Sequence, residues 1–374
     1  MKILCVGGHF DDDNGRRSSI IDTIGQGADK LVNGGNYTVL ESLIDEIKAF
    51  DVIYWFADVP NDKPKLVERI KAIHPKSVLV TSKRNYGGEY PIQQLVQRML
   101  KTHSNLLVEF TGATRVINGA NLDTKYAARV LDPLGNSFGT WTLDMNEISD
   151  ILRDRIVQLN SFTRVASYEW PTGITIPCKA DDEFMDIIHQ HAAKFHQLIY
   201  GEVPIDRFLG NASFRCTKGF PSFKSGELIY VTRRNVNKAT LDADSFVPVF
   251  PHDSDDHCPY IIYQGKHKPS VDTPVQVMLY NRYKRAKYMM HSHVYVKLTD
   301  DVPVYVGMNS HNRLIPCGAL EEYDKIIDLV PDRDACNFAV NLRGHGFIVI
   351  ADNLDFMQSI QYVERDVPEV HMEW

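Results

Sequence analysis

The sequence has no apolar run of about twenty residues, no Cys-x-x-Cys pair, no internal repeat and no low-complexity segment. The first absence excludes a transmembrane helix, and the apolar start Met1–Gly8 is too short for a secretory signal. The six cysteines stand far apart, which indicates reduced thiols and predicts a cytoplasmic protein. Basic residues number 41 against 48 acidic ones, which gives a net charge of −7. Neither nucleic acid nor a membrane is therefore expected as a partner.

Residues 1 to about 165 alternate apolar strand segments with amphipathic helix segments. The expected strands cover residues 2–6, 51–57, 77–81 and 105–111, and the expected helices cover 39–50, 63–73, 92–100 and 145–159. Apolar strands that alternate with helices indicate βαβ units. The sequence therefore predicts a first domain over residues 1–165 that is a doubly wound parallel α/β sheet of Rossmann or flavodoxin-like type. Its role is left open among nucleotide binding, regulation and assembly.

Charged residues gather in the loops that would follow these strands. They are Asp11, Asp12, Asp13, Arg16, Arg17, Lys83, Arg84 and Arg115. Ligands of open parallel sheets bind at the carboxyl ends of the strands, and Gly7-Gly8 before a helix could cradle a phosphate. The spacing is not Gly-x-Gly-x-x-Gly, however, so ordinary turn glycines and solvated charges are the simpler interpretation.

The second predicted domain, residues 170–374, contains a strand-like stretch, 287–296, with two histidines. Side chains alternate faces along a strand, so His291 and His293 should point the same way. Two imidazoles on one rigid face make half a tetrahedral metal site. The alternative is one buried core histidine and one surface histidine. A third histidine, His345, stands between two glycines that let the backbone bend sharply between apolar strands.

Two further motifs complete a set with a fixed order. Gly210-Asn211-Ala212-Ser213 comes first, and Lys268-Pro269-Ser270-Val271-Asp272-Thr273-Pro274 precedes an expected helix over residues 275–283. Asp272 could cap that helix or reach a metal. With His291-Ser292-His293 and Arg343-Gly344-His345-Gly346, the order resembles the class II aldolase/adducin family over residues 180 to 360 or so.

This resemblance implies an α/β/α sandwich with an antiparallel central sheet. It also implies a homotetramer or other homo-oligomer with the active site at a subunit boundary, and Zn²⁺ or another divalent transition metal on His291, His293 and His345. Such a three-histidine site leaves a coordination position open, where the metal polarises a carbonyl and stabilises an enediolate. The implied activity is that of a lyase (aldolase) or epimerase acting on a small anionic hydroxy-carbonyl compound such as a sugar phosphate, with a dehydratase also open.

The residue at position 272 distinguishes two branches of the family. The aldolase branch has a Glu there that serves as acid/base, whereas Asp272 resembles the sugar-phosphate 4-epimerase branch, in which the Asp sits at the metal. Whether Asp272 is the fourth ligand or a general base stays open.

The family's phosphate pocket is only partly kept. Gly210, Asn211 and Ser270 match it, but Thr232-Arg233-Arg234-Asn235 replaces its Thr-x-Ser-Gly turn and Val271 replaces a second Ser. We expect Thr232 and Arg233 to help hold an anion, because guanidinium groups bind phosphate or carboxylate; ordinary solvated charge is the alternative. The rival functions are a catalytically silent, adducin-like scaffold and a nucleotide-binding N-terminal domain that carries the function.

Three other groups are weaker candidates. His252 to His257 has metal-ligand residue types, but an exposed acidic loop explains it more simply. Glu321 and Glu322 open an expected helix, and one of them, or His311, could supply an acid/base group across a subunit boundary.

Overall fold

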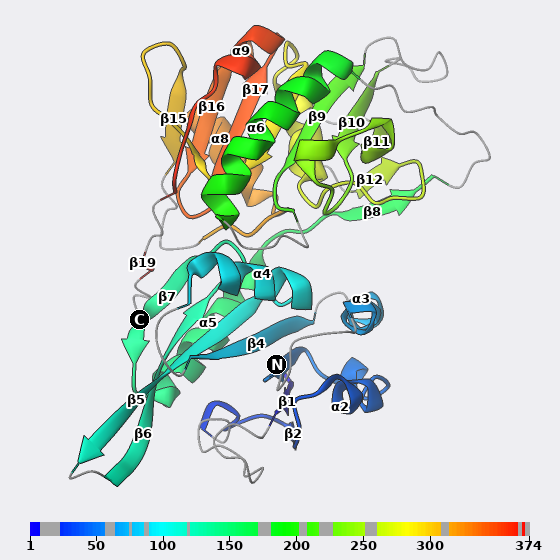
Figure 1. Cartoon of the computed structure of the whole chain (residues 1–374). Helices are drawn as coiled ribbons and strands as arrows, with labels where there is room; N and C mark the ends of the chain where they lie inside the picture. Colours follow the sequence, from blue (N-terminus) through cyan, green and yellow to red (C-terminus); the bar gives the residue numbers. More distant parts are fainter. Residues whose placement is uncertain are drawn as a thin grey trace. The chain divides into compact units, whose positions relative to one another are not determined.

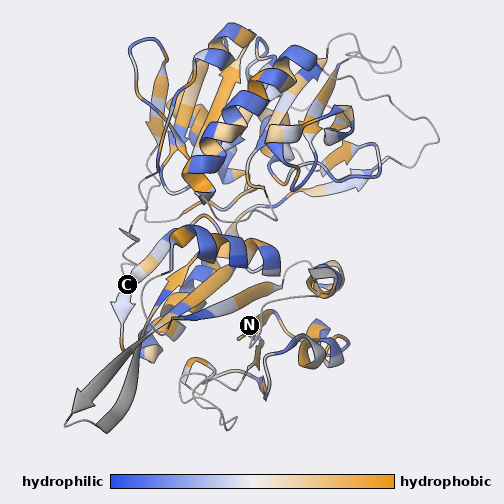
Figure 2. Ribbon diagram, viewed as in Figure 1, coloured by the Kyte–Doolittle hydropathy of each residue, from blue (hydrophilic) through white to orange (hydrophobic). Residues whose placement is uncertain are grey.

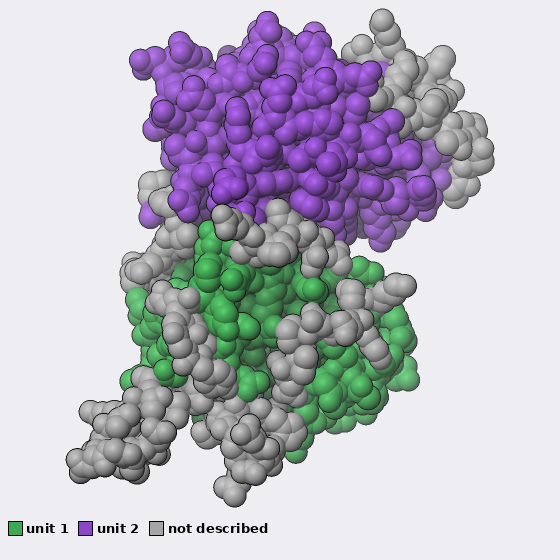
Figure 3. Space-filling view, viewed as in Figure 1, with its two compact units in different colours: residues 1–160, 367–374 green, residues 161–366 purple. Residues whose placement is uncertain are grey.

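The structure is a computed structural model, and it describes residues 1–7, 23–56, 64–74, 77–85, 90–117, 120–170, 181–201, 208–216, 227–250, 260–307, 314–365 and 369–370. The chain divides into two compact units. Unit 1 comprises Met1–Asn160 with Val367–Trp374, and unit 2 comprises Ser161–Asp366 (Figure 3). No helix in the described ranges is long and apolar enough to cross a bilayer.

Unit 1 contains a run of five parallel strands. In spatial order they are β2 (Lys30–Val32), β1 (Ile3–Val6), β3 (Val52–Trp55), β4 (Val78–Asn85) and β5 (Leu106–Ile117). Between them the chain forms α2 (Tyr37–Ser42), the 3-10 turn η1 (Ile47–Ala49), α3 (Pro64–Ile73) and α4 (Ile92–Thr102). The strand order 2-1-3-4-5 is that of flavodoxin-like folds, which confirms the predicted doubly wound parallel sheet for this part of the chain.

The helices pack on the sheet through the apolar positions that the sequence pattern identified. Residues from α2 and α3 share a core cluster with alternate residues of β1 and β3. The predicted helix 39–50 is shorter than expected, because α2 ends at Ser42 and the chain continues through turns into η1. Leu40, Leu43 and Ile47 are nevertheless all buried, so the helical spacing of these apolar residues correctly predicted which of them face the core.

The sheet of unit 1 also has an antiparallel extension that the sequence did not predict. After β5 the chain forms β6 (Ala120–Leu131) and β7 (Ser137–Thr142), and β6 is antiparallel to both β5 and β7; β19 (Glu369–Val370) pairs with β7 in parallel. The predicted domain 170–374 included this last strand. The helix α5 (Met145–Ser161) lies on the opposite face from α4: its Arg155 stacks on Phe138, whereas α4 packs with Leu107 and Leu131 (Figure 1).

Unit 2 is built on a nine-stranded sheet. Its order is β15 (Val304–Gly307), β16 (Phe338–Leu342), β17 (Gly346–Ala351), β13 (Tyr288–Ser292), β9 (Asn211–Cys216), β10 (Leu228–Thr232), β11 (Phe246–Phe250), β12 (Tyr260–Tyr263) and β8 (Ala166–Glu169). The strands from β16 to β12 are antiparallel to one another, and only the edge strands β15 and β8 pair in parallel. This confirms the predicted antiparallel central sheet.

Helices cover both faces of that sheet. α6 (Asp182–Tyr200) and α9 (Leu354–Ser359) pack on the face that carries Met290 and Val349, as Figure 1 shows for α6. α7 (Thr273–Arg282) and α8 (Glu321–Leu329) pack on the face that carries Met289 and Ile348. Successive residues of a strand thus pack into the two cores on opposite faces of the sheet, and the central strands are apolar on both faces (Figure 2). The result is the expected α/β/α sandwich, with two short 3-10 turns, η2 (Lys238–Thr240) and η3 (Ala243–Ser245), and a separate strand pair, β14 (Tyr295–Val296) with β18 (Tyr362–Val363).

Candidate metal centre

His291 and His293 come from the end of β13, at the middle of the sheet of unit 2. β13 pairs with β9 on one side and β17 on the other, which fixes His291 opposite Asn211 and Ile348. The strand ends at Ser292, one residue before His293. The two side chains still converge as predicted, since the Nε2 atoms of His291 and His293 lie 3.1 Å apart.

His345 reaches the same place through the turn between β16 and β17. The turn closes with a hydrogen bond from the His345 amide to the Leu342 carbonyl, 3.0 Å long, and Gly344 and Gly346 both have positive φ. A Cβ at Gly346 would collide with the Ser292 carbonyl and lie 2.8 Å from the Cα of His293. Glycine therefore lets the turn lie directly against the end of β13, which brings His345 beside the other two rings.

The three histidines, which we call the histidine cluster, can hold a divalent metal ion. Their ligand atoms all lie within 4.8 Å of one another, and all three side chains are buried. The Nδ1 atom of His291 donates a hydrogen bond to the Phe347 carbonyl at 2.7 Å, and that of His345 donates to the Ile315 carbonyl at 2.8 Å. These bonds fix the rings in the tautomer whose Nε2 carries a lone pair, the form that binds a metal.

The electrostatics of the cluster also favour neutral rings. Burial, together with the neighbouring His291 and His345 rings, holds the pKa of His293 well below its usual range. Burial lowers the pKa of His291 too, although Asp272 and Glu322 oppose that shift. The Nε2 atom of His345 is buried and has no hydrogen-bond partner. Two imidazoles whose pKa values burial lowers, beside a third with an unsatisfied nitrogen, suit a metal ion.

Asp272 lies beside the cluster and does not cap α7. It occupies the N-cap position, but its side chain makes no capping hydrogen bond. Its Oδ2 instead accepts hydrogen bonds from Asn211 Nδ2 at 2.7 Å and from Ser270 Oγ at 3.3 Å, and lies 4.0 Å from His291 Nε2. Its Oδ1 is buried without a hydrogen-bond partner. Of the roles considered for this residue, that of helix cap is therefore wrong.

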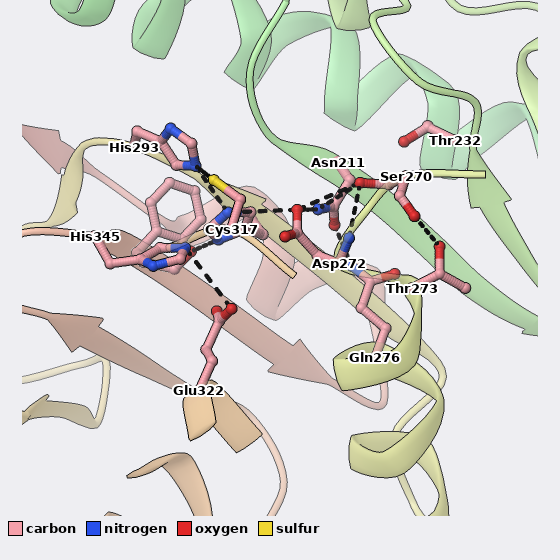
Figure 4. Close-up of polar contacts among 12 residues, drawn as sticks. Asn211, Thr232, Ser270, Asp272, Thr273, Gln276, His293, Cys317, Glu322 and His345 are labelled. Carbon is pink, nitrogen blue, oxygen red and sulfur yellow. Dashed lines mark hydrogen bonds and ion pairs between the residues drawn. The ribbon is translucent and has the colours of Figure 1, made fainter. Parts of the chain in front are cut away.

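The predicted anion-binding residues Asn211, Ser270 and Thr232 also come together (Figure 4). With Gly210, which precedes Asn211 in the chain, we call them the Gly210 loop. Gly210 has φ +83°, and a Cβ there would lie 2.5 Å from the His291 carbonyl oxygen. Asn211 donates to Ser270 and Asp272 and accepts from Gln276. Thr232 accepts a hydrogen bond from the Ala212 amide at 3.1 Å. The side chains of this loop thus bond to one another and to the neighbouring Asp272, Gln276 and Ala212.

Arg233 has different neighbours from those predicted. Its guanidinium donates a hydrogen bond to the His267 ring at 3.0 Å, because the chain after β10 bridges to Pro269 and runs beside residues 267–269. The cation found behind the Gly210 loop is Lys238, whose Nζ donates to the Phe208 carbonyl at 3.2 Å. Lys238 is 1% exposed, and burial lowers its pKa to about 7 against the opposing attraction of Asp272.

Two further residues lie at the cluster: Cys317, which the sequence did not identify, and Glu322, which was considered as an acid/base group from across a subunit boundary and lies beside His345 of its own chain. The Sγ atom of Cys317 lies 3.6 Å from His293 Nε2, and Oε2 of Glu322 lies 3.7 Å from His345 Nε2 (Figure 4). Glu322 is buried on the same side of α8 as Ile326, one helical turn away, so a carboxylate on an apolar helix face was an available signal. No pattern in the sequence marks Cys317.

Residues 252–257, His311 and the loop with Asp11 to Arg17 lie outside the described residues, as does the side chain of Arg115.

Comparison with known proteins places the cluster in a family. Residues 190–360 match the family model for the Class II Aldolase and Adducin N-terminal domain. YgbL from Escherichia coli, a putative aldolase/epimerase/decarboxylase, is 15% identical; the match covers 50% of this chain and 95% of that one, with a TM-score of 0.31. The N-terminal class II aldolase domain of a conserved protein from Thermoplasma acidophilum is 17% identical, with coverages of 50% and 91% and a TM-score of 0.32.

A DNA/pantothenate metabolism flavoprotein from Streptococcus pneumoniae is 11% identical, with coverages of 42% and 99% and a TM-score of 0.32. No curated protein matches the chain significantly. By the family model, and with the four motifs in place on an α/β/α sandwich, the segment 190–360 of this chain belongs to the class II aldolase and adducin family.

Proposed function

We propose that unit 2 is a divalent-metal-dependent lyase or epimerase that acts on a small anionic hydroxy-carbonyl compound such as a sugar phosphate. The observation that carries this proposal is the histidine cluster, in which three buried imidazoles present ligand atoms within 4.8 Å of one another. Buried polar groups are normally hydrogen-bonded, so a buried His345 Nε2 without such a partner points to a ligand that the fold was built to receive.

We propose zinc, or another divalent transition metal, as the ion held by His291, His293 and His345. Imidazole nitrogens suit zinc, copper, iron and nickel, whereas magnesium and calcium prefer oxygen ligands. When bound, such an ion supplies Lewis-acid chemistry, which polarises a carbonyl and stabilises the enediolate of aldol cleavage or epimerisation.

In this proposal Asp272 acts as the general base. Its Oδ2 is held by Asn211 and Ser270, while Oδ1 is buried and free to take a proton. The 4.0 Å separation from His291 Nε2 is longer than the roughly 3.3 Å that two ligands of one tetrahedral zinc would show, which favours a base over a fourth ligand. The hydrogen bond from Asn211 Nδ2 keeps this carboxylate oriented.

The anionic end of the substrate is proposed to lie at Gly210, Asn211 and Ser270. A residue without a Cβ at position 210 lets the backbone approach other groups closely. Lys238 replaces Arg233 as the basic residue we propose for this end, because the Arg233 guanidinium is engaged by His267. The proposed homo-oligomeric state and cytoplasmic location rest on the family and on the free cysteines of the described chain.

One observation favours a second candidate, a binding or scaffold protein that kept the fold and lost the reaction. Polar side-chain atoms of the Gly210 loop already make hydrogen bonds to one another and to Asp272 and Gln276, so a phosphate would have to compete with those bonds. The two candidates differ in whether the protein binds and uses a metal.

The deciding experiment is elemental analysis of metal per chain for the wild type, His293→Ala and the control His189→Ala, which changes a histidine of α6 in the same unit. About one equivalent of zinc, manganese, iron or cobalt in the wild type and the control, lost in His293→Ala, supports the enzyme. Sugar phosphates and related hydroxy-carbonyl acids would then be screened for cleavage or epimerisation. A wild type that contains no metal and takes none up on addition would exclude the enzyme and leave the scaffold.

A further inference from the structure

Cys317 stands in a segment whose position is fixed from three sides. The Ile315 carbonyl accepts the Nδ1–H of His345, and the Cys317 carbonyl accepts a hydrogen bond from Arg164. Gly318 has φ +72°, and a Cβ there would lie 2.6 Å from the Val271 carbonyl oxygen, so this segment rests directly on the chain next to Asp272. The thiol is therefore held at the histidine cluster by packing.

The distance between Cys317 and His293 is the one that two ligands of one metal ion show. With zinc–sulfur and zinc–nitrogen bonds of about 2.3 and 2.05 Å, the tetrahedral angle places sulfur and nitrogen about 3.6 Å apart and two nitrogens about 3.3 Å apart. The observed separations are 3.6 Å from Cys317 Sγ to His293 Nε2 and 3.1 Å from His291 Nε2 to His293 Nε2. The contacts of the two carboxylates with the cluster are longer than the roughly 3.4 Å expected of an oxygen ligand, at 4.0 Å for Asp272 and 3.7 Å for Glu322.

A second, independent feature of the site points to a ligand. The Nε2 atom of His345 is buried and has no hydrogen-bond partner, although the imidazole is held by its Nδ1. Apolar neighbours cannot form a hydrogen bond with this nitrogen. A metal ion that is also bound by His291 and His293 would satisfy it.

We propose that Cys317 is the fourth protein ligand of the metal in unit 2, bound as a thiolate alongside His291, His293 and His345. This inference rests on the proposed metal site and goes beyond it. The thiol proton passes to solvent when the sulfur–metal bond forms, so no oxidant or reductant is needed. Four protein ligands close the coordination shell in the resting protein, and a substrate must then displace the thiolate or expand the shell.

This assignment has two consequences. Thiolate selects the softer ions, so the site prefers zinc or cobalt to manganese or magnesium. Asp272 is not needed as a ligand and stays available as a base, hydrogen-bonded to Asn211.

The test is the absorption spectrum of the full-length protein loaded with Co²⁺. Cobalt in place of zinc gives a sulfur-to-cobalt charge-transfer band in the near ultraviolet only when a thiolate is bound. We expect this band in the wild type and in the control Cys336→Ser, and its loss in Cys317→Ser with the weaker visible bands of cobalt retained. Elemental analysis gives the cobalt content of each sample.

Two outcomes separate this inference from the proposed function. Cobalt bound to the wild type without a charge-transfer band would overturn the Cys317 assignment and leave the histidine site standing. A wild type that binds no cobalt or zinc would overturn both. If Cys317→Ser does not fold, alkylation of the wild type with iodoacetamide answers the same question. Zinc must then protect Cys317 but not Cys336, as read by peptide mass spectrometry, and equal alkylation with and without zinc would contradict the proposal.

Discussion

The histidine cluster and the Gly210 loop are neighbours in unit 2, but they use their polar atoms in opposite ways. At the cluster, His345 Nε2, His293 Nδ1 and Glu322 Oε2 are buried without hydrogen-bond partners. In the loop, Asn211, Ser270 and Thr232 all make described hydrogen bonds to neighbouring groups of the same fold. The histidine cluster therefore has polar atoms that a bound metal would satisfy. The Gly210 loop has its side chains hydrogen-bonded already, and it holds Asp272 in place. Binding of a metal should therefore depend on the cluster, and stability without metal should depend on the loop.

The largest effect is expected where the turn that carries His345 packs against the end of β13. Gly346→Ala should destabilise unit 2 by more than about 4 kcal/mol, or prevent its folding, because the new Cβ collides with the Ser292 carbonyl. The control is Gly265→Ala: it has φ +118° but nothing within 4 Å of the added Cβ, so it should cost only about 1 kcal/mol of backbone strain. Urea unfolding followed by circular dichroism gives both free energies. Equal losses would show that backbone conformation, and not the collision, sets the effect.

Removal of the metal tests whether the histidine cluster binds it. A ligand present at a thousand times its Kd stabilises the folded state by about 4 kcal/mol, so a chelator should lower the Tm of the zinc-loaded wild type markedly. The same chelator should leave the Tm of His345→Ala unchanged and should lower that of His189→Ala as it does the wild type. Differential scanning fluorimetry is a sufficient measurement. A chelator effect that survives in His345→Ala would place the metal elsewhere in the chain.

In the Gly210 loop, Asn211→Ala should lower the stability of the folded protein. This change removes the 2.7 Å hydrogen bond to Asp272 inside the protein, which should cost about 1–3 kcal/mol of unfolding free energy. The metal content should stay at the wild-type value, because Asn211 contributes no ligand to the cluster. Elemental analysis and urea unfolding on the same sample make the two readouts comparable. If Asn211→Ala loses the metal as His293→Ala does, the two regions are one coupled network and the contrast between them fails.

The same contrast explains how much could be predicted from the sequence. The three histidines lie in short motifs, His-x-His and Gly-His-Gly, so local strand and turn geometry was enough to expect them together. Cys317 reaches the cluster only because the segment before α8 packs on the sheet, and no local rule describes that packing; Glu322 was a candidate from the sequence, but its position beside His345 of the same chain was not expected. Arg233 was expected at the anion site from its place in a motif, but its side chain follows residues 267–269 instead.

Within unit 1, too, one part of the fold could be predicted from the sequence and another could not. Alternating apolar strands and amphipathic helices predicted the parallel part of unit 1, because each element buries its own periodic face. The antiparallel pair β6–β7 was missed because its turn depends on side-chain bonds. Asp132 Oδ1 accepts hydrogen bonds from the Leu134 and Asn136 amides, and Gly135 has φ +81°. The sequence showed the turn residues there but not the two strands that they join.

The smallest effect concerns the charge behind the Gly210 loop. The pKa of Lys238 falls from 10.5 to about 7 in the folded protein, because burial disfavours the charged form. Between these values the unfolded chain carries the proton and the folded chain does not, so unfolding takes up a proton and stability rises with pH. This residue contributes a slope of at most about 1.4 kcal/mol per pH unit, the value for one proton. Lys238→Met should remove that slope between pH 7.5 and 9 and raise stability most at the lower pH, while leaving the metal content unchanged. Unfolding free energies of wild type and variant that run parallel over this range would mean that Lys238 keeps its proton, and that the loop beside the neutral histidines carries a permanent positive charge.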